Sequence, residues 1–367
     1  MANDTRTKSP LTISLHRRPK VLLLGNGMNR VYGGASWAGL LEKINRTHYT
    51  TEQVKSMPFP LQAVLLSQDH VDVSLQDLQQ ELTQCEVHPW LAEQLHRLLA
   101  LPFDCILTPN FTYEVECALF PDFLNHPQRF LRHTAAVPRA EKYFMLHTYY
   151  SLPLARGNIP LFHVHGEARV PNTVILGHYY YGNLLFCCDE YLTHRAPEQR
   201  YPLWPGHEEL EALSWLDYFI LGDVYSLGFG FDTSEMDLWW LLCRKKRERA
   251  PHGDLWFFEP ARRSAEAKHA LLEAYQVKNV SLGFQDPKGV PGLLRSRSEG
   301  DQPSAPRQRP RGSGSVLIPM ILFTYVKDPS SQERFPFLAV FMPSDRSTPP
   351  QTPKTGPLPG ASAAPGA

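Results

Sequence analysis

Short apolar runs alternate with amphipathic segments through most of this chain. The run PKVLLLGNG at 19–27 ends in glycines, and in the following segment, SWAGLLEKI at 36–44, apolar residues recur at helical spacing. This pattern predicts a strand, a glycine turn and a helix. The same alternation continues to residue 282. It predicts an α/β fold with a mostly parallel sheet and helices on both faces.

The remaining elements follow from the same periodicities. We expect further strands in 103–110, 159–166, 173–178, 223–231, 254–260 and 277–282. We expect helices in 75–99, with a break near Pro89, and in 111–120, 179–192, 232–249 and 261–275. The stretch between 121 and 158 shows no clear period. In open α/β sheets, ligands bind outside the carboxyl ends of the strands, so candidate site residues are sought there.

The composition changes after about residue 286. Of the 33 prolines, 14 fall within the last 77 residues, and 295–315 and 343–367 are rich in residues that bury little apolar surface. These two segments are predicted to be disordered. The apolar stretches 315–326 and 335–342 lie between them. Either these stretches dock on the core, or the whole tail is a displaced reading frame.

The chain is therefore divided into three parts. We expect a flexible N-terminus at 1–17, one α/β domain with a helical insertion at 18–286, and a Pro-rich, low-complexity, largely disordered tail at 287–367. Neither the N-terminus nor any other segment holds an apolar run long enough for a signal peptide or a membrane span. We expect a cytoplasmic protein with no membrane partner.

Charge and cysteine content exclude several functions. The chain has 37 basic and 37 acidic residues, so a general nucleic-acid binder, which needs a basic excess, is disfavoured. Its six cysteines include no C-x-x-C pair, which leaves no local zinc ribbon or redox motif. We interpret the cysteines as small core residues and expect no zinc.

The first candidate site is the glycine turn after the first strand. Its residues are Gly25, Asn26, Gly27, Met28 and Asn29. Glycines there let backbone N–H groups approach a phosphate. The G-x-G-x-x-G fingerprint fails because Arg30 occupies its last position, and no acidic residue follows at the spacing that ribose binding needs. A bare tight turn is the alternative, and a nicotinamide dehydrogenase is poorly supported.

Two later strand ends carry polar groups. Thr108, Asn110 and Thr112 follow one strand, and either Asn110 or Thr112 is alternatively an N-cap of the next helix. His163 and His165 end another strand, where their spacing predicts that both rings lie on one face. They are either a metal pair, or one core histidine and one exposed histidine.

The last candidate turn precedes the helix expected from residue 232. It contains Gly228, Phe229 and Gly230. Asp232 and Glu235 beyond it have the spacing of a capping box. The basic run 244–249 is interpreted as a solvated complement to the carboxyl end of that helix.

Taken together and in order, these segments resemble the bacterial sirtuin-like (silent information regulator type) domain family. The segments are LLLGNGMNR, ILTPN with FTYEVECAL, FHVHGE, PNTVILGHYYYG and YSLGFGFDTSEMDLWWLL, within about 18–284. The resemblance implies a Rossmann-like NAD site. Gly25 and Gly27 would lie on the phosphates, Asn110 on the ribose and catalytic water, and Gly228 against the nucleotide, with His165 as the base.

Two departures narrow the implied function. Thr112 stands where the family often carries an acid, and the four zinc cysteines of sirtuin deacetylases are missing. The chain then resembles the NAD-hydrolysing effectors of antiphage defence. We expect an NAD glycohydrolase that cleaves NAD to nicotinamide and ADP-ribose. Its activity is expected to need a trigger, and to involve an activating partner or a homo-oligomer.

Three alternatives remain. The first is a module that senses NAD or ADP-ribose without turnover, for which Thr112 is the main support. A metal-dependent hydrolase using His163 and His165 ranks behind it, because no third or fourth ligand is found at an ordered spacing. A protein deacetylase ranks last.

Overall fold

The computed structural model describes most of the first 282 residues and two later segments. The described residues are 11–14, 17–30, 34, 36–70, 74, 76–77, 79, 86–127, 131–134, 144–194, 209–212, 214–247, 253–260, 266–282, 320–327 and 334–341. Within them, no helix is both long and apolar enough to cross a membrane.

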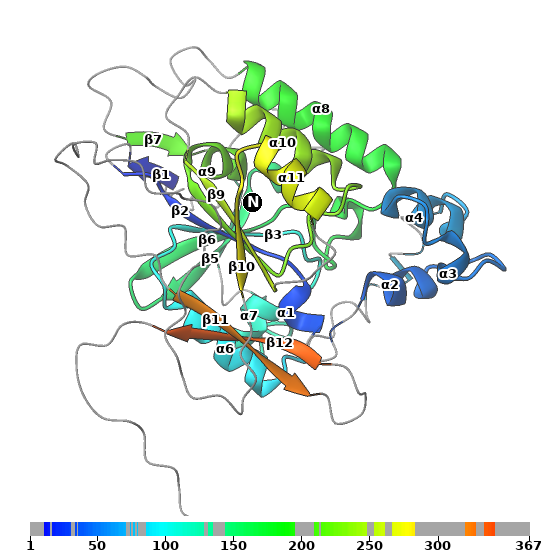
Figure 1. The fold of residues 1–367 in the computed structure, drawn as a ribbon, viewed down its shortest axis with the longest axis horizontal. Helices are drawn as coiled ribbons and strands as arrows, with labels where there is room; N and C mark the ends of the chain where they lie inside the picture. The colour runs from blue at the N-terminus through cyan, green and yellow to red at the C-terminus, as the bar shows by residue number, and fades with distance from the viewer. Residues whose placement is uncertain are drawn as a thin grey trace, which may run out of the picture.

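A mixed sheet forms the centre of the molecule (Figure 1). Among the described residues it has eight strands, in the order β10-β9-β8-β2-β3-β6-β5-β4. Their bounds are Lys278–Leu282 for β10, Leu255–Pro260 for β9, Asp223–Leu227 for β8, Lys20–Leu24 for β2, Cys105–Thr108 for β3, Gly157–His163 for β6, Thr148–Leu154 for β5 and Leu131–Thr134 for β4. The first six strands in this order are parallel, and β5 and β4 add an antiparallel edge.

The strand order is that of a Rossmann-like fold. The first parallel strand along the chain, β2, lies in the middle; the chain builds outward through β3 and β6 on one side, then returns to β8, β9 and β10 on the other. The order therefore reverses between β2 and β8, and such a switch point leaves a crevice at the carboxyl ends of the strands. The prediction of an α/β fold with a mostly parallel sheet is confirmed.

Helices cover both faces of the sheet. They are α1 (Gly27–Arg30), α2 (Trp37–Lys43), α3 (Thr51–Val54), α4 (Phe59–Ser67), α6 (Pro89–Leu99), α7 (Glu114–Leu119), α8 (His178–His194), α9 (Trp215–Leu221), α10 (Met236–Arg247) and α11 (Glu266–Ala274). Along β2, Val21 and Leu23 pack with α8, α9, α10 and α11, while Leu22 and Leu24 pack with α6 and α7. Because β2 is buried on both faces, its sequence is an unbroken apolar run.

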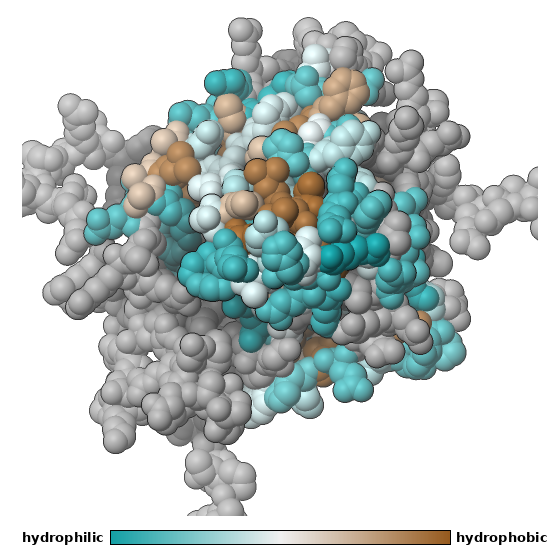
Figure 2. Space-filling view, turned by 90° about the vertical axis from the view of Figure 1, so that its right-hand side faces the viewer, coloured by the Kyte–Doolittle hydropathy of each residue, from teal (hydrophilic) through white to brown (hydrophobic). Residues whose placement is uncertain are grey.

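A third apolar cluster joins the helical insertion to the domain. Leu41 of α2, Val54 of α3 and Leu66 of α4 pack on Val174 and Leu176. These helices lie at one side of the sheet in Figure 1. Figure 2 shows the face on that side, where apolar side chains gather in the middle of a hydrophilic surround.

Two small sheets complete the described structure. Strand β1 (Leu11–Ser14) pairs antiparallel with β7 (Glu209–Ala212). In the tail, β11 (Met320–Lys327) and β12 (Arg334–Phe341) form an antiparallel hairpin, and the backbone of β12 lies beside α6. The predicted disorder of 295–315 and 343–367 falls outside the described residues.

The structure corrects four expectations. Residues 173–178 are not a strand. Thr173 ends the short 3-10 helix η3 (Pro171–Thr173), 174–177 are buried coil, and His178 begins α8; the antiparallel strand β5 already pairs with the free edge of β6. The region without a clear period contains β4, β5 and the 3-10 helix η2 (Phe144–Leu146). Helix α9 had no predicted counterpart.

The fourth correction concerns the basic run at the end of α10. Lys245 is buried, and its ammonium donates to the carbonyl oxygens of Phe219 (2.7 Å), Ile220 (2.8 Å) and Gly222 (2.7 Å). It therefore caps the carboxyl end of α9 and is not a solvated charge. Burial lowers the pKa of Lys245 to about 7.

Candidate functional site

The four candidate turns meet at one edge of the sheet. They follow β2, β3, β6 and β8, which are neighbouring parallel strands in the order β8-β2-β3-β6. Parallel strands end at the same edge, so residues as far apart in sequence as Gly25 and Gly230 are collected there.

The glycines of the first and last turns allow two loops to touch. The Gly25 N–H donates to the Leu227 carbonyl (2.8 Å) and the Gly27 N–H to the Gly228 carbonyl (2.7 Å). A Cβ on Gly25 would lie 2.5 Å from the Phe229 Cα, so no larger residue fits there. Gly228 has φ +65°, which favours glycine. Close packing therefore explains these glycines, and their N–H groups point at the neighbouring loop.

Other residues of these turns are divided between core and surface. Met28 and Phe229 are buried in the hydrophobic clusters, and Gly230 is exposed. The Asn29 amide donates to the Asn26 side-chain oxygen (3.0 Å), which ties the turn together. Of this group, Asn26 and Gly230 are the more exposed.

The turn after β3 is fixed by Thr108. Its hydroxyl donates to the Leu24 carbonyl (2.9 Å) and accepts from the Asn110 N–H (3.2 Å). Helix α7 begins after Tyr113, which makes no side-chain cap, and the Thr112 hydroxyl donates to Glu114 (2.6 Å). Neither Asn110 nor Thr112 is the helix N-cap, so the capping alternative is wrong.

His163 lies in a closed environment beside this turn. One ring nitrogen, Nδ1, bonds to the Asn110 carbonyl (2.7 Å), and the other, Nε2, bonds to Glu116 (2.8 Å). Both side chains of the His163–Glu116 pair are 1% exposed. Burial disfavours the charged ring, but Glu116 outweighs it and raises the pKa of His163 to about 9. His163 therefore holds the backbone of Asn110 in place.

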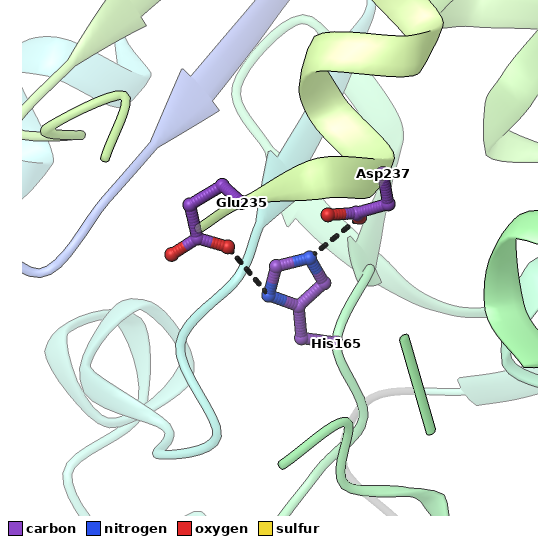
Figure 3. Close-up of side chains that lie close together, drawn as sticks. All are labelled: His165, Glu235 and Asp237. Atoms are coloured by element: carbon purple, nitrogen blue, oxygen red, sulfur yellow. Dashed lines mark hydrogen bonds and ion pairs between the residues drawn. The ribbon is translucent and has the colours of Figure 1, made fainter. Parts of the chain in front are cut away.

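His165 contacts a different part of the molecule. Its Nε2 lies 2.7 Å from Asp237 Oδ2 and its Nδ1 lies 3.9 Å from Glu235 Oε2 (Figure 3). Glu235 immediately precedes α10 and Asp237 lies in its first turn. The ring also contacts the edge of Tyr181 on α8, whose hydroxyl donates to Glu235 (2.9 Å).

Charge at this cluster favours a protonated imidazole. Burial lowers the pKa of His165, but Asp237, through its charge and its hydrogen bond, and then Glu235 raise it to about 9. Burial raises the pKa of Glu235. The second oxygen of Asp237, Oδ1, is buried and has no hydrogen-bond partner among the described residues. The cluster thus holds one imidazole between two carboxylates.

The expectation that both histidine rings lie on one face is wrong. Strand β6 ends at His163, and the chain then turns through Gly166, which has φ +87°. A Cβ on Gly166 would lie 2.1 Å from the Thr173 carbonyl oxygen, so the turn depends on glycine. The turn directs His163 to Glu116 on α7 and His165 to Asp237 on α10. A metal held by both histidines is therefore not supported.

The carboxylates around His165 were not identified from the sequence. The spacing of Asp232 and Glu235 predicts a capping box, whereas in the structure Asp232 accepts from the Ser234 N–H (2.9 Å) and Glu235 accepts from the Tyr181 hydroxyl. Within the described residues, His165, Glu235 and Asp237 form the group with the proximity of metal ligands, with ligand atoms within 4.8 Å of one another. The only sequence signal for this group is a pair of acids, Glu235 and Asp237, shortly after the turn at Gly230. Their partner, His165, lies 70 positions before Glu235, so no local pattern connects them.

Comparisons with known proteins leave the family open. No protein-family model matches the chain, and no curated protein is similar to it in sequence.

Proposed function

We propose that this protein is an NAD glycohydrolase that cleaves NAD to nicotinamide and ADP-ribose. The observation that carries the proposal is that the turns holding Asn110 and His165 lie together at the carboxyl edge of a Rossmann-like sheet, on the side of the switch point that begins with β2. The two turns are bonded to each other: Val164 N–H donates to the Thr108 carbonyl (2.8 Å), and His163 holds Asn110. Dinucleotides bind at this position in folds of this order.

The chemistry suits these residues. Cleaving the bond between nicotinamide and ribose expels a neutral base from a cation, so the two-carboxylate arrangement of ordinary glycosidases is not required. The transition state is oxocarbenium-like. The Asn110 amide would hold a ribose hydroxyl and the attacking water, and His165 would accept a proton, a contribution of about 10²–10⁴ in rate.

The glycine turns would form the nucleotide side of the site. In this proposal, Gly25–Asn29, Thr108 and Gly228–Gly230 border the NAD, and the turns after β2 and β8 lie against each other there. The N–H groups of Gly25 and Gly27 bond within the protein, so we assign these glycines to the close packing of the two turns. Uncontrolled NAD loss would harm a cell, so we further propose that the protein is a cytoplasmic effector of antiviral defence whose activity waits for a trigger or partner.

A second candidate function is NAD or ADP-ribose sensing without turnover. It is favoured by the protonated state of His165, since an imidazole whose pKa is about 9 is largely charged at neutral pH and cannot act as a base in that form. Thr112, whose hydroxyl is engaged by Glu114, adds to this case.

One incubation separates the two functions. The purified full chain is incubated with NAD while nicotinamide and ADP-ribose are quantified, and thermal stabilisation by NAD is measured in parallel. Asn110→Ala should abolish cleavage and leave the melting temperature unchanged, because the hydrogen bonds that Asn110 makes to Thr108 and His163 are made by its backbone. Asn125→Ala, on an exposed asparagine, is the matched control.

Each result of this experiment supports or rejects one of the two functions. Stabilisation by NAD without products favours the sensor, and cleavage that survives in Asn110→Ala rejects the assigned site. If NAD neither stabilises the protein nor is cleaved by it, both functions are rejected. Adding an acetylated peptide tests the deacetylase alternative, for which we expect nicotinamide release without deacetylation.

A further inference from the structure

The two carboxylates beside His165 differ in burial and in distance. Asp237 is fully buried and bonds Nε2 at 2.7 Å, whereas Glu235 is 18% exposed and lies 3.9 Å from Nδ1. The imidazole itself is 3% exposed. Glu235 therefore marks the open side of the cluster, and Asp237 the closed side.

This asymmetry determines which nitrogen exchanges a proton. The Nε2 proton is held in a short, charge-assisted hydrogen bond to a buried carboxylate, and losing it would leave the Asp237 carboxylate without a side-chain donor among the described residues. The Nδ1 proton has no such bond, because 3.9 Å is beyond hydrogen-bond distance. When His165 becomes neutral, the proton leaves Nδ1, and its lone pair then faces Glu235.

The spacing between Nδ1 and Glu235 suits one hydroxyl group. An oxygen placed about 2.8 Å from each atom would span the 3.9 Å between them. Tyr181 donates to the same Glu235 oxygen at 2.9 Å and holds that carboxylate in position. Figure 3 shows the Glu235 carboxylate and the imidazole pointing toward each other across this interval.

We propose that Nδ1 of His165 and the carboxylate of Glu235 together receive a hydroxyl group of the substrate or its attacking water, and that Asp237 is the positioning residue that fixes the imidazole for this task. The assignment rests on the proposed NAD glycohydrolase function. It names the reactive nitrogen, adds Glu235 as a catalytic residue, and gives α10 a role at the site.

The proton balance is simple. The hydroxyl O–H bond breaks as its oxygen attacks or is polarised, and the proton forms an N–H bond at Nδ1 of the neutral ring. The resulting imidazolium is stabilised by Asp237. After the product leaves, the proton passes to Glu235, the exposed member of the cluster, and then to water.

The groups that face His165 set the pH range of this step. They are Glu235 and Asp237 at the start of α10 and Tyr181 on α8, with Asp232 acting on Glu235 and Tyr181, and Cys188 of α8 facing Asp237. Burial raises the pKa of Tyr181 and of Cys188, so both are neutral near pH 9. Turnover should therefore rise with pH until His165 loses its proton, near pH 9.

The first test does not depend on activity. Nitrogen NMR of the full chain follows the His165 ring with pH, and His165→Gln identifies its signals among the 15 histidines. We expect a pKa near 9 and a neutral ring that keeps its proton on Nε2. In Asp237→Asn and in Glu235→Gln the pKa should fall toward the ordinary value of about 6.5, and only Asp237→Asn should change the tautomer preference.

The matched control is Asp189→Asn, an exposed acid on α8. It should leave the His165 titration unchanged. A neutral ring protonated on Nδ1 in the unaltered protein, or a titration that neither Asp237→Asn nor Glu235→Gln moves, would overturn the proposal. Because Glu235 is partly exposed, Glu235→Gln should remain folded even if Asp237→Asn does not.

The second test uses NAD hydrolysis. Glu235→Gln should lower kcat by at least about tenfold and move the alkaline limb of the pH profile to lower pH. An NAD analogue lacking a hydroxyl on the nicotinamide ribose distinguishes the two sources: loss of sensitivity to Glu235→Gln indicates the ribose hydroxyl, and retained sensitivity indicates water. An unchanged kcat and pH profile contradicts the proposal, whereas a wild-type chain that never cleaves NAD rejects the proposed function and leaves the NMR result to decide this assignment.

Discussion

His163 and His165 are two residues apart, yet the fold gives them opposite environments. His163 bonds through both ring nitrogens, to a backbone carbonyl and to Glu116, and its ring is packed against Tyr113 and Tyr150. His165 bonds firmly through one nitrogen and faces the partly exposed Glu235 with the other. The buried His163–Glu116 pair, in which both ring nitrogens are hydrogen-bonded, stabilises the fold. The Nδ1 atom of His165, which faces the partly exposed Glu235, is the nitrogen available for proton transfer.

The pKa values alone do not separate the two histidines. Carboxylates raise the pKa of each ring to about 9 against the effect of burial. The distinguishing feature is geometric: Glu116 is as buried as His163, while Glu235 is more exposed than His165. Substitutions at the two positions should therefore affect different measurements.

The largest expected difference is in turnover. His165→Ala should reduce NAD cleavage by at least about 100-fold, because it removes the proton acceptor. His163→Ala should retain more activity, because the His163 ring acts only through its hydrogen bond to the Asn110 carbonyl and touches no substrate in our proposal. Rates are measured at 20 °C on folded protein with saturating NAD, and chelators should change neither rate.

Equal losses at both positions would remove the distinction. If a chelator also inactivated the unmodified protein, and added zinc or manganese restored it, a metal mechanism would replace the one proposed here.

Stability should show the reverse order. His163→Ala leaves Glu116 buried without its partner and should lower the free energy of unfolding by about 3 kcal/mol, as is typical when one partner of a buried pair is removed. The measurement is urea unfolding at pH 7. Adding Glu116→Gln to His163→Ala should recover part of the loss, and a double variant that is additive would show that the two residues are not coupled.

The pH dependence of stability tests the charges of both rings. A histidine whose folded pKa lies above its unfolded value of about 6.5 stabilises the fold fully below that pH, and the contribution is lost as pH rises through the folded pKa. With both values at about 9, the urea midpoint should fall between pH 6.5 and 9. His163→Gln should flatten this fall, and a midpoint that is constant over the range would contradict the assigned charges.

The smallest effect is expected beside Asn110. Thr112→Val removes the hydroxyl that bonds Glu114 without touching either histidine ring, so cleavage should fall by less than about tenfold. Thr112→Ser is the control that keeps the hydroxyl. A loss as large as that of His165→Ala would place Thr112 in the reaction itself.

Local patterns predicted much of the sheet. The strands β2, β3, β6 and β8 are largely buried on both faces, so apolar residues predominate in each and the run is easily seen in the sequence. The strand ends then indicated Asn110 and His165 as candidates. Local patterns do not predict the antiparallel β4 and β5, the coil at 174–177 or the burial of Lys245, since each depends on a neighbour distant in the chain.

The sequence by itself determined most of the parallel strands and the turns and helices that follow them, because periodicity and glycine placement act over a few residues. It also determined which residue types arrive at the carboxyl ends of the strands. Only the tertiary structure decided what each of them contacts. Asp237 meets His165 because β6 and β8 end at the same edge and Gly166 turns the chain toward α10. Hydrogen bonds between residues 72 positions apart depend on sheet order and on the direction of a turn, which no local pattern contains.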